Sequence, residues 1–193
     1  MGGAVNGARP AVATLLTVAA VAGGCSRGVE RIHFDTALPA CSDFVAVLTA
    51  VGMPGPRPGP EPSAQNPEAG LDCLFGAEPG SRPPLVAATS FMINRPTFKY
   101  AEDDPVKRFG ETFVAKVGCQ GFGADNPALP AGSSCYQPQG KQYVTMTVTS
   151  IAKQSGIRIS LDWADTSTQW PSKLQTDALD KANTVAQAVI AKL

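Results

Sequence analysis

The residues with the most reactive side chains in this chain of 193 residues are five cysteines and one histidine. The cysteines are Cys25, Cys41, Cys73, Cys119 and Cys135. A thiol in a protein can be acylated, oxidised to a disulfide, coordinated to zinc or used as a nucleophile. Which of these chemistries applies to each cysteine depends on its spacing and on the elements around it.

Cys25 follows a short apolar segment near the N-terminus. Residues 1–10 carry one charged side chain, and residues 11–22 are a run of twelve apolar or small residues. A helix that crosses a bilayer needs about 20 apolar residues, so this run is too short to be one. A basic start, a short apolar centre and small residues before a cleavage point are typical of an export signal.

The residues just before Cys25 indicate which kind of export signal this is. The sequence VAGGC resembles the lipobox of bacterial lipoproteins, with Ala22 where Leu or Val is usual. The resemblance implies that residues 1–24 are a signal peptide and that Cys25 becomes an acylated N-terminus. A diacylglyceryl group would then hold the chain on the extracytoplasmic face of the cell membrane, because one acyl chain alone binds only marginally. The alternative is an ordinary secretory signal that contains a cysteine.

With Cys25 assigned to lipid, an even number of cysteines remains. Four cysteines in an oxidising compartment indicate two disulfides, for which three pairings are possible. We predict Cys41–Cys73 and Cys119–Cys135, because neighbouring cysteines close the shortest loops. Zinc ligands usually come in close pairs, whereas these spacings are 32, 46 and 16 residues. No metal and no cofactor is therefore expected.

The sequence offers little of the machinery of an enzyme. His33 is the only histidine, and it lies in an expected tether, which is a poor place for a positioned base. No G-x-S-x-G, Walker or H-E-x-x-H pattern occurs. Sixteen basic and sixteen acidic residues give no net charge, which argues against a nucleic-acid partner. We predict no catalytic residue, and a hydrolase remains the second alternative.

Hydrophobic periodicity predicts an α+β fold in which an antiparallel β-sheet packs against helices. The expected strands are residues 72–77, 85–93, 143–151 and 156–163, the last two forming a hairpin. The expected helices are residues 42–51, capped by Ser42 and ended by Gly52, residues 104–118, and residues 172–193. A Pro-rich loop over 53–70 and a Gly-rich loop over 119–135 connect them. We expect a lipidated N-terminus and tether over 25–39, followed by a single domain over 40–193.

Several of these features together resemble a family. They are the lipobox, the sequence Pro-Ala-Cys41 before a short apolar helix, Asp72-Cys73-Leu74-Phe75, the second cysteine pair, the hairpin and the Ala/Val-rich terminal helix. The chain is similar to small actinobacterial cell-envelope lipoproteins of unassigned function. More distantly, it is similar to the two-disulfide extracellular sensor domain of mycobacterial receptor serine/threonine kinases. The resemblance implies a compact binding domain outside the membrane.

The expected function is therefore that of a non-catalytic binding or sensor-like module. Its partners would be the membrane, through the lipid anchor, and an envelope protein or a cell-wall or lipid ligand. Phe122, Asp125 and Asn126 in the Gly-rich loop are the predicted contact residues, although an aromatic there can equally be a plug into the core. The first alternative is a carrier of envelope lipids or glycolipids, which requires an apolar cavity between sheet and helices.

Overall fold

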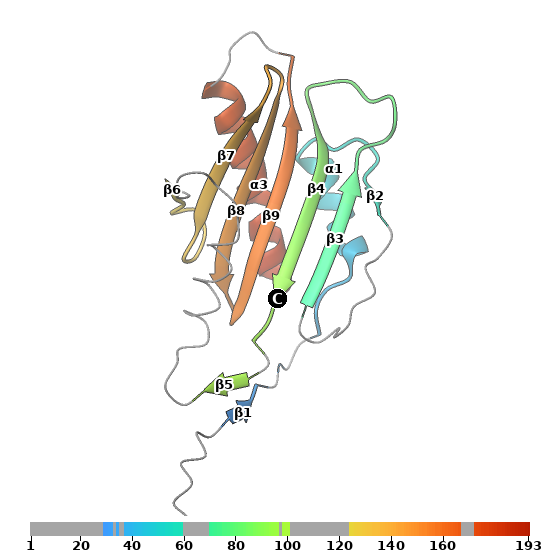
Figure 1. Ribbon diagram of the computed structural model, residues 1–193. Coiled ribbons are helices and arrows are strands. Elements are labelled where there is room, and N and C mark those ends of the chain that lie inside the picture. Colours follow the sequence, from blue (N-terminus) through green and yellow to red (C-terminus); the bar gives the residue numbers. More distant parts are fainter. Residues whose placement is uncertain are drawn as a thin grey trace, which may run out of the picture.

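The computed structural model describes residues 29–32, 34, 37–59, 70–96, 98–100, 124–166 and 172–193. It confirms the predicted α+β class, because an antiparallel sheet of seven strands packs against helices on one face (Figure 1). A separate two-stranded antiparallel ribbon lies beyond one end of this sheet.

The large sheet has the strand order β2-β3-β4-β9-β8-β7-β6. Its strands are β2 (Arg57–Pro58), β3 (Gly70–Gly76), β4 (Leu85–Asn94), β6 (Ala124–Asp125), β7 (Ser133–Gln139), β8 (Tyr143–Ala152) and β9 (Ser155–Ala164). The ribbon pairs β1 (Val29–Arg31) with β5 (Phe98–Tyr100). The described helices are the 3-10 helix η1 (Cys41–Phe44) and the α-helices α1 (Val45–Ala50) and α3 (Ser172–Lys192).

The centre of the sheet is the predicted hairpin of β8 and β9. Both strands alternate between apolar residues that face the helices and polar residues on the opposite side, which is the pattern of a sheet with one buried face. The expected connection of about four residues is shorter in the structure, where Ala152 pairs with Ser155. Lys153 and Gln154 form the turn with φ of 47° and 58°, as a type I′ hairpin turn requires.

The C-terminal helix α3 covers the middle of the sheet, as its apolar stripe predicted. Seven side chains on one face of the helix are buried against β8 and β9. They are Leu174, Ala178, Ala182, Val185, Ala186, Val189 and Leu193. The small alanines in this stripe let the helix backbone approach the strands closely.

The short helical segment η1–α1 packs beside α3 over β3 and β4. Its predicted apolar face is buried, with Phe44 and Leu48 fully inaccessible. The predicted cap is wrong, however. The segment begins at Cys41, and the carboxylate of Asp43 accepts a 3.0 Å hydrogen bond from the backbone N–H of Ala40, so Ser42 lies inside the first turn.

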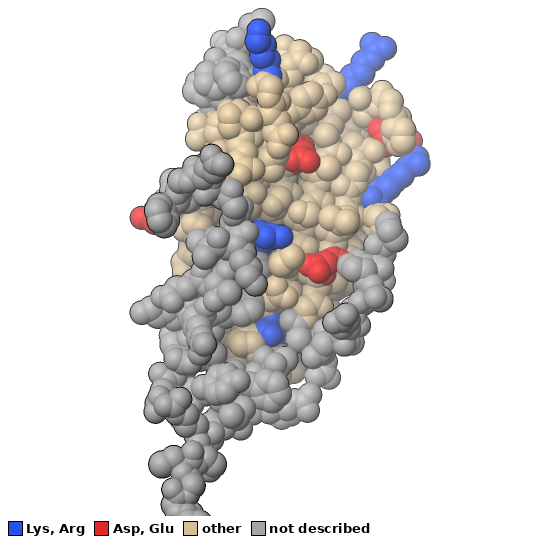
Figure 2. All heavy atoms as spheres, in the orientation of Figure 1, with Lys and Arg blue, Asp and Glu red and all other residues tan. Residues whose placement is uncertain are grey.

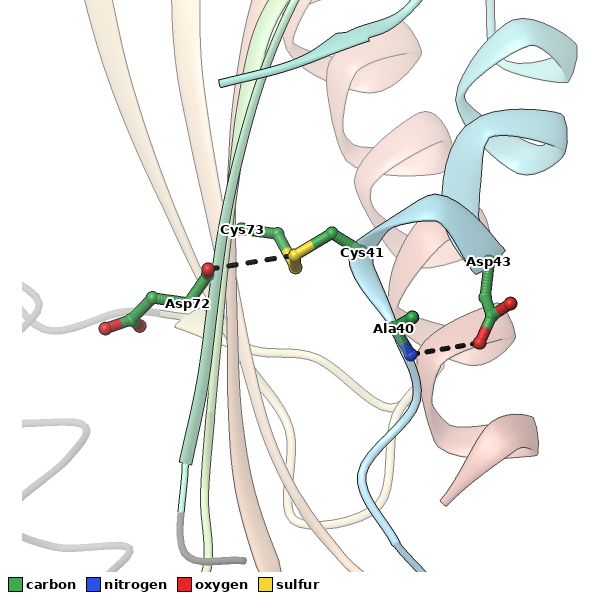
Figure 3. Close-up of a disulfide and its surroundings, with 5 residues drawn as sticks. All are labelled: Ala40, Cys41, Asp43, Asp72 and Cys73. Atoms are coloured by element: carbon green, nitrogen blue, oxygen red, sulfur yellow. Dashed lines mark hydrogen bonds between the residues drawn. A yellow bond between two sulfur atoms is a disulfide. The ribbon is translucent and has the colours of Figure 1, made fainter. Parts of the chain in front are cut away.

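The disulfide Cys41–Cys73 joins this helical segment to β3 (Figure 3). Cys73 points from the strand toward η1, and the Cys41 sulfur lies 3.8 Å from the carbonyl oxygen of Asp72. Cys135 on β7 is also disulfide-bonded. Cys119 lies outside the described residues, so its pairing with Cys135 remains a prediction.

Three segments differ from the sequence-based expectation. Residues 29–31, expected in the tether, form β1 because they pair with β5. Within the expected loop 119–135, β6 forms and β7 begins. The start of the Pro-rich loop is also structured, since Met53 is fully buried and Arg57–Pro58 form the edge strand β2. The expected helix over 104–118 lies outside the described residues.

No helix in the described part of the chain is both long and apolar enough to span a membrane.

Candidate binding site

The face of the large sheet that is turned away from α1 and α3, called here the outer face, is rich in hydroxyl groups. On β7, β8 and β9 these groups pair across neighbouring strands. Ser133 Oγ lies 2.6 Å from Thr149 Oγ1, and Thr147 Oγ1 lies 3.0 Å from Ser160 Oγ. Figure 2 views the molecule from this side and shows that the described surface is mostly uncharged, with isolated acidic and basic groups.

Solvent access to the outer face changes along β8. Tyr143, the first residue of the strand, is 46% exposed, whereas Thr147 and Thr149 are 8% and 2% exposed. Their outward direction follows from the strand alternation, because Val144, Met146 and Val148 are buried in the helix-covered core. Along β8, the accessible end of the outer face is therefore the end where β8 begins and β9 ends.

A pocket of about 510 Å³ opens at this accessible end. Its lining includes Ala87, Gln139, Gly140, Tyr143, Thr145 and Asp162, from β4, β7, β8, β9 and the β7–β8 turn. Strand register brings these residues together, because Thr145 stands opposite Asp162 and Tyr143 stands opposite Gln139. The pocket is thus built on paired strands rather than on a long loop, which positions its side chains firmly.

A chain of hydrogen bonds orders the polar side chains of this pocket. The Gln139 Nε2 group donates to Thr145 Oγ1 at 3.2 Å, and the Thr145 hydroxyl donates to Asp162 Oδ1 at 2.7 Å. Because the Thr145 proton is directed to the carboxylate, its oxygen is left to accept from the amide. One carboxylate, one amide and one hydroxyl are therefore held in fixed relative positions beside the exposed Tyr143.

Small residues leave space on the side of Asp162 that faces β4, away from Thr145. Ala88 stands opposite Asp162, and Gly76 stands opposite Ala88 on the next strand. A side-chain carbon at Gly76 would meet nothing described within 4 Å. The register shifts between Val86 and Ala88, so Ala87 is the extra residue of a β-bulge. Bulges commonly occur next to functional sites because they redirect side chains locally.

The predicted contact residues lie elsewhere, on the turn between β6 and β7. Asp125 is exposed on β6, while Asn126 is only 4% exposed. The Asn126 side-chain amide donates a 2.7 Å hydrogen bond to Asn183 Oδ1, and its Oδ1 accepts from the N–H of Ala128 at 3.3 Å. These bonds fasten the turn to α3, so Asn126 has a structural role in this fold. Phe122 lies outside the described residues.

Other predicted positions are only partly described. Cys25 and His33 lie outside the described residues. No group of three or more metal-binding side chains comes together within the described ranges. The structure brings the predicted pair Cys41 and Cys73 together in one disulfide.

Sequence reasoning missed the pocket residues Tyr143 and Asp162, although a signal for them exists. Both belong to the polar side of the predicted hairpin, to which the sequence analysis assigns no site. The distinguishing signal is a tyrosine on the polar side of a strand, directly after a Gly-containing turn. Whether this tyrosine belongs to a pocket depends on its cross-strand neighbours, and these are known only when the strand register is known.

No family model matches the chain. No curated protein matches it either. The fold and the pocket define it as a disulfide-stapled α+β domain with a polar pocket at one end of the outer face of its sheet.

Proposed function

We propose that this protein is an exported, lipid-anchored, non-catalytic binding module whose ligand occupies the outer-face pocket. The observation that carries the proposal is the ordered group of Gln139, Thr145 and Asp162 beside the exposed ring of Tyr143. Pockets that combine a few fixed polar groups with aromatic surface are the usual sites of ligand binding.

The position of the pocket relative to the N-terminus supports an outward-facing module. Val29 begins β1 only four residues after Cys25, a span of at most about 14 Å. The β1–β5 ribbon lies beyond the end of the sheet at which β4 ends, whereas the pocket lies where β4 begins (Figure 1). Seven residues of β4 separate Ala87 from Asn94, or about 23 Å.

A contact near the ribbon helps to hold the N-terminal segment at that end. The guanidinium of Arg95, just after β4, lies 4.5 Å from the ring centroid of Phe34, which follows β1. Arg95 Nε also donates a 3.4 Å hydrogen bond to Ser155 Oγ, and burial lowers the Arg95 pKa. A lipid at Cys25 would thus attach the end of the domain that is remote from the pocket.

The lipid-carrier alternative needs an apolar cavity between sheet and helices. In the described part of the chain, that space is occupied by core side chains. Phe44 packs edge-to-face on Phe91 at 5.3 Å between ring centroids, and Phe75 packs on Phe91 at 5.3 Å. The described pocket lies on the opposite face, which favours the binding module.

Photo-crosslinking on intact cells of an actinobacterial host tests this proposal. A photoreactive phenylalanine analogue at position 143 keeps an aromatic ring in the pocket. The matched control places the same analogue at Thr184, which is exposed on α3. We expect a covalent adduct with an envelope component from position 143 alone, on a chain with acylated Cys25 that Cys25→Ala releases from the membrane.

Two results would contradict the proposal. One is the same set of adducts from positions 143 and 184, because a specific pocket must capture a component that an unrelated surface position does not. The other is a full-length, unacylated chain in the cytosol.

A further inference from the structure

We infer that the outer-face pocket binds a neutral saccharide. This inference rests on the proposed function and adds the chemical class of the ligand to it.

The charge of the described lining disfavours anionic ligands. Among the described residues that line it, Asp162 is the only charged one, and it is an acid. The described part of the lining contains no Lys or Arg that would balance a phosphate, sulfate or carboxylate. An anionic ligand would therefore be repelled by the one charge that faces it.

The hydrogen-bonding groups of the pocket disfavour a purely apolar ligand. Covering Asp162, Thr145 and Gln139 with hydrocarbon would remove their water without replacing its hydrogen bonds, which is costly for each group. The pocket needs a ligand that both donates and accepts hydrogen bonds at several points.

Hydroxyl groups on a sugar ring meet that need. Asp162 is fixed by the Thr145 hydroxyl at Oδ1, and its carboxylate has further lone pairs that accept from ligand O–H groups. The Gln139 amide, fixed by its bond to Thr145, has a carbonyl oxygen and a second N–H. Asp162, directly opposite Thr145, and Gln139, diagonal to it on β7, therefore offer acceptors and a donor on either side of Thr145. This arrangement matches adjacent hydroxyls that can each donate and accept.

The exposed ring of Tyr143 supplies the remaining part of a saccharide site. Its ring stands beside Gln139 across the β7–β8 pair and is 46% exposed. An aromatic ring with a polar tip offers apolar surface to the C–H face of a sugar while its hydroxyl stays hydrated. The depression beside Ala87 and Ala88 leaves room for a ring placed along the strands.

A cationic amine is the nearest competitor, since a carboxylate and an aromatic ring also attract cations. The structure favours the sugar for two reasons. Asp162 is already engaged by a neutral hydroxyl, and the lining residues that the structure describes include one aromatic ring rather than a cage. The other fixed polar groups, Thr145 and Gln139, are uncharged.

Calorimetric titration of the mature lipidated protein in lipid nanodiscs tests this inference. The probes are neutral gluco-, manno- and galacto-oligosaccharides, with tetramethylammonium and a glucuronate-containing oligosaccharide as counter-probes. We expect at least one neutral oligosaccharide to bind and both counter-probes to fail. Tyr143→Ala should weaken binding tenfold or more, and Tyr143→Phe, which keeps the ring, should stay within threefold of the natural protein.

Two further variants separate the ligand classes. Asp162→Asn keeps acceptor and donor capacity, so saccharide binding should fall less than tenfold, whereas a cation site would lose binding completely. Met92→Ala, on the outer face far from the pocket, should leave affinity unchanged. The thermal unfolding midpoint of each variant confirms that it is folded.

The outcomes are distinct. Binding of tetramethylammonium, or loss of all binding in Asp162→Asn, overturns the saccharide assignment in favour of a cation. Failure of every neutral oligosaccharide overturns it as well. If position 143 still yields a specific crosslink on cells in either case, the proposed function stands and only the ligand class is wrong.

Discussion

The two faces of the large sheet are built from the same strands but have opposite chemistry. The face toward α1 and α3 contains fully buried apolar side chains such as Phe91 and Ile159. On this face, the disulfide Cys41–Cys73 joins η1 to β3. The outer face contains a ladder of hydroxyls that ends in the pocket around Asp162. Successive residues of one strand therefore face different environments, one in the apolar core and the next on the polar outer face. The inner face holds the buried apolar core, and the outer face carries the polar pocket.

This separation explains how the pocket tolerates polar, partly desolvated groups. Burying hydroxyls and a carboxylate costs free energy unless each finds a partner. On the outer face, Thr145, Thr147 and Thr149 are each bonded to a side chain on a neighbouring strand. The apolar core behind them keeps the register that makes these pairs possible.

The largest difference between the faces should come from two adjacent residues of β4. Phe91→Ala should destabilise the fold by about 3–5 kcal/mol, because it removes a ring packed between Phe44 and Phe75 and leaves a cavity. Met92→Ala, which changes the half-buried outward neighbour, should cost less than about 1 kcal/mol. Urea unfolding monitored by circular dichroism measures both. Equal losses in the free energy of unfolding of the two variants would show that the inner face is not the main source of stability.

The second largest effect should follow from removing the disulfide of the inner face. Cys41→Ala combined with Cys73→Ala should lower the free energy of unfolding by about 3–4 kcal/mol, since the bond closes a loop with a sequence separation of 32. Asp72→Ala, at the exposed neighbour on the outer face, serves as the control and should change stability by less than about 0.5 kcal/mol. Chemical denaturation under non-reducing conditions compares the two proteins. If the double cysteine variant lost less free energy of unfolding than Asp72→Ala, the disulfide would not be a main source of stability.

A smaller effect should distinguish the two residues of the β6–β7 turn. Asn126→Ala should cost about 1–3 kcal/mol, because Asn183 loses its buried partner and the turn loses its bond to α3. Asp125→Ala, at the exposed neighbour, should be nearly neutral in stability. Thermal denaturation of both variants gives the comparison. If Asn126→Ala kept full stability but abolished the envelope crosslink, the turn would be the contact site after all.

The smallest effect should be a gain of stability at the β8–β9 turn. Lys153 and Gln154 both adopt positive φ, which side-chain-bearing residues rarely do. Replacing the pair with Asn-Gly should stabilise the fold by about 1 kcal/mol, because that dipeptide suits a type I′ turn. Ligand affinity should not change, since the turn lies at the opposite end of β8 from the pocket. A loss of stability on differential scanning calorimetry would contradict the assigned turn geometry.

The parts of the fold that the sequence predicted are those with strong local patterns. The alternation along β8 and β9 and the stripe from Leu174 to Leu193 each encode one buried face. The type and the residue range of these elements were therefore predictable. The strands β1, β2, β5, β6 and β7 were missed because they are short or polar, and β7 contains Pro138. Such segments become strands through pairing with distant neighbours, which tertiary context decides.

The candidate site was less predictable than the fold, for a related physical reason. Gln139, Tyr143 and Asp162 come from three strands, and their proximity depends on pairing registers that no local pattern reveals. Asn126 had the right chemistry for a contact residue, but α3 lies against it and uses its side chain. A polar residue on a turn therefore indicates binding only when the neighbouring elements leave it accessible.

Amide NMR of the mature lipidated protein in nanodiscs tests the central claim most directly. Titration with neutral oligosaccharides released from the host cell envelope should shift the signals of Gln139, Tyr143, Thr145 and Asp162. The signals of Asp125, of Asn126 and of α3 should remain in place. Shifts confined to the β6–β7 turn or to α3, with the four pocket signals unchanged, would contradict the assignment of binding to the outer face.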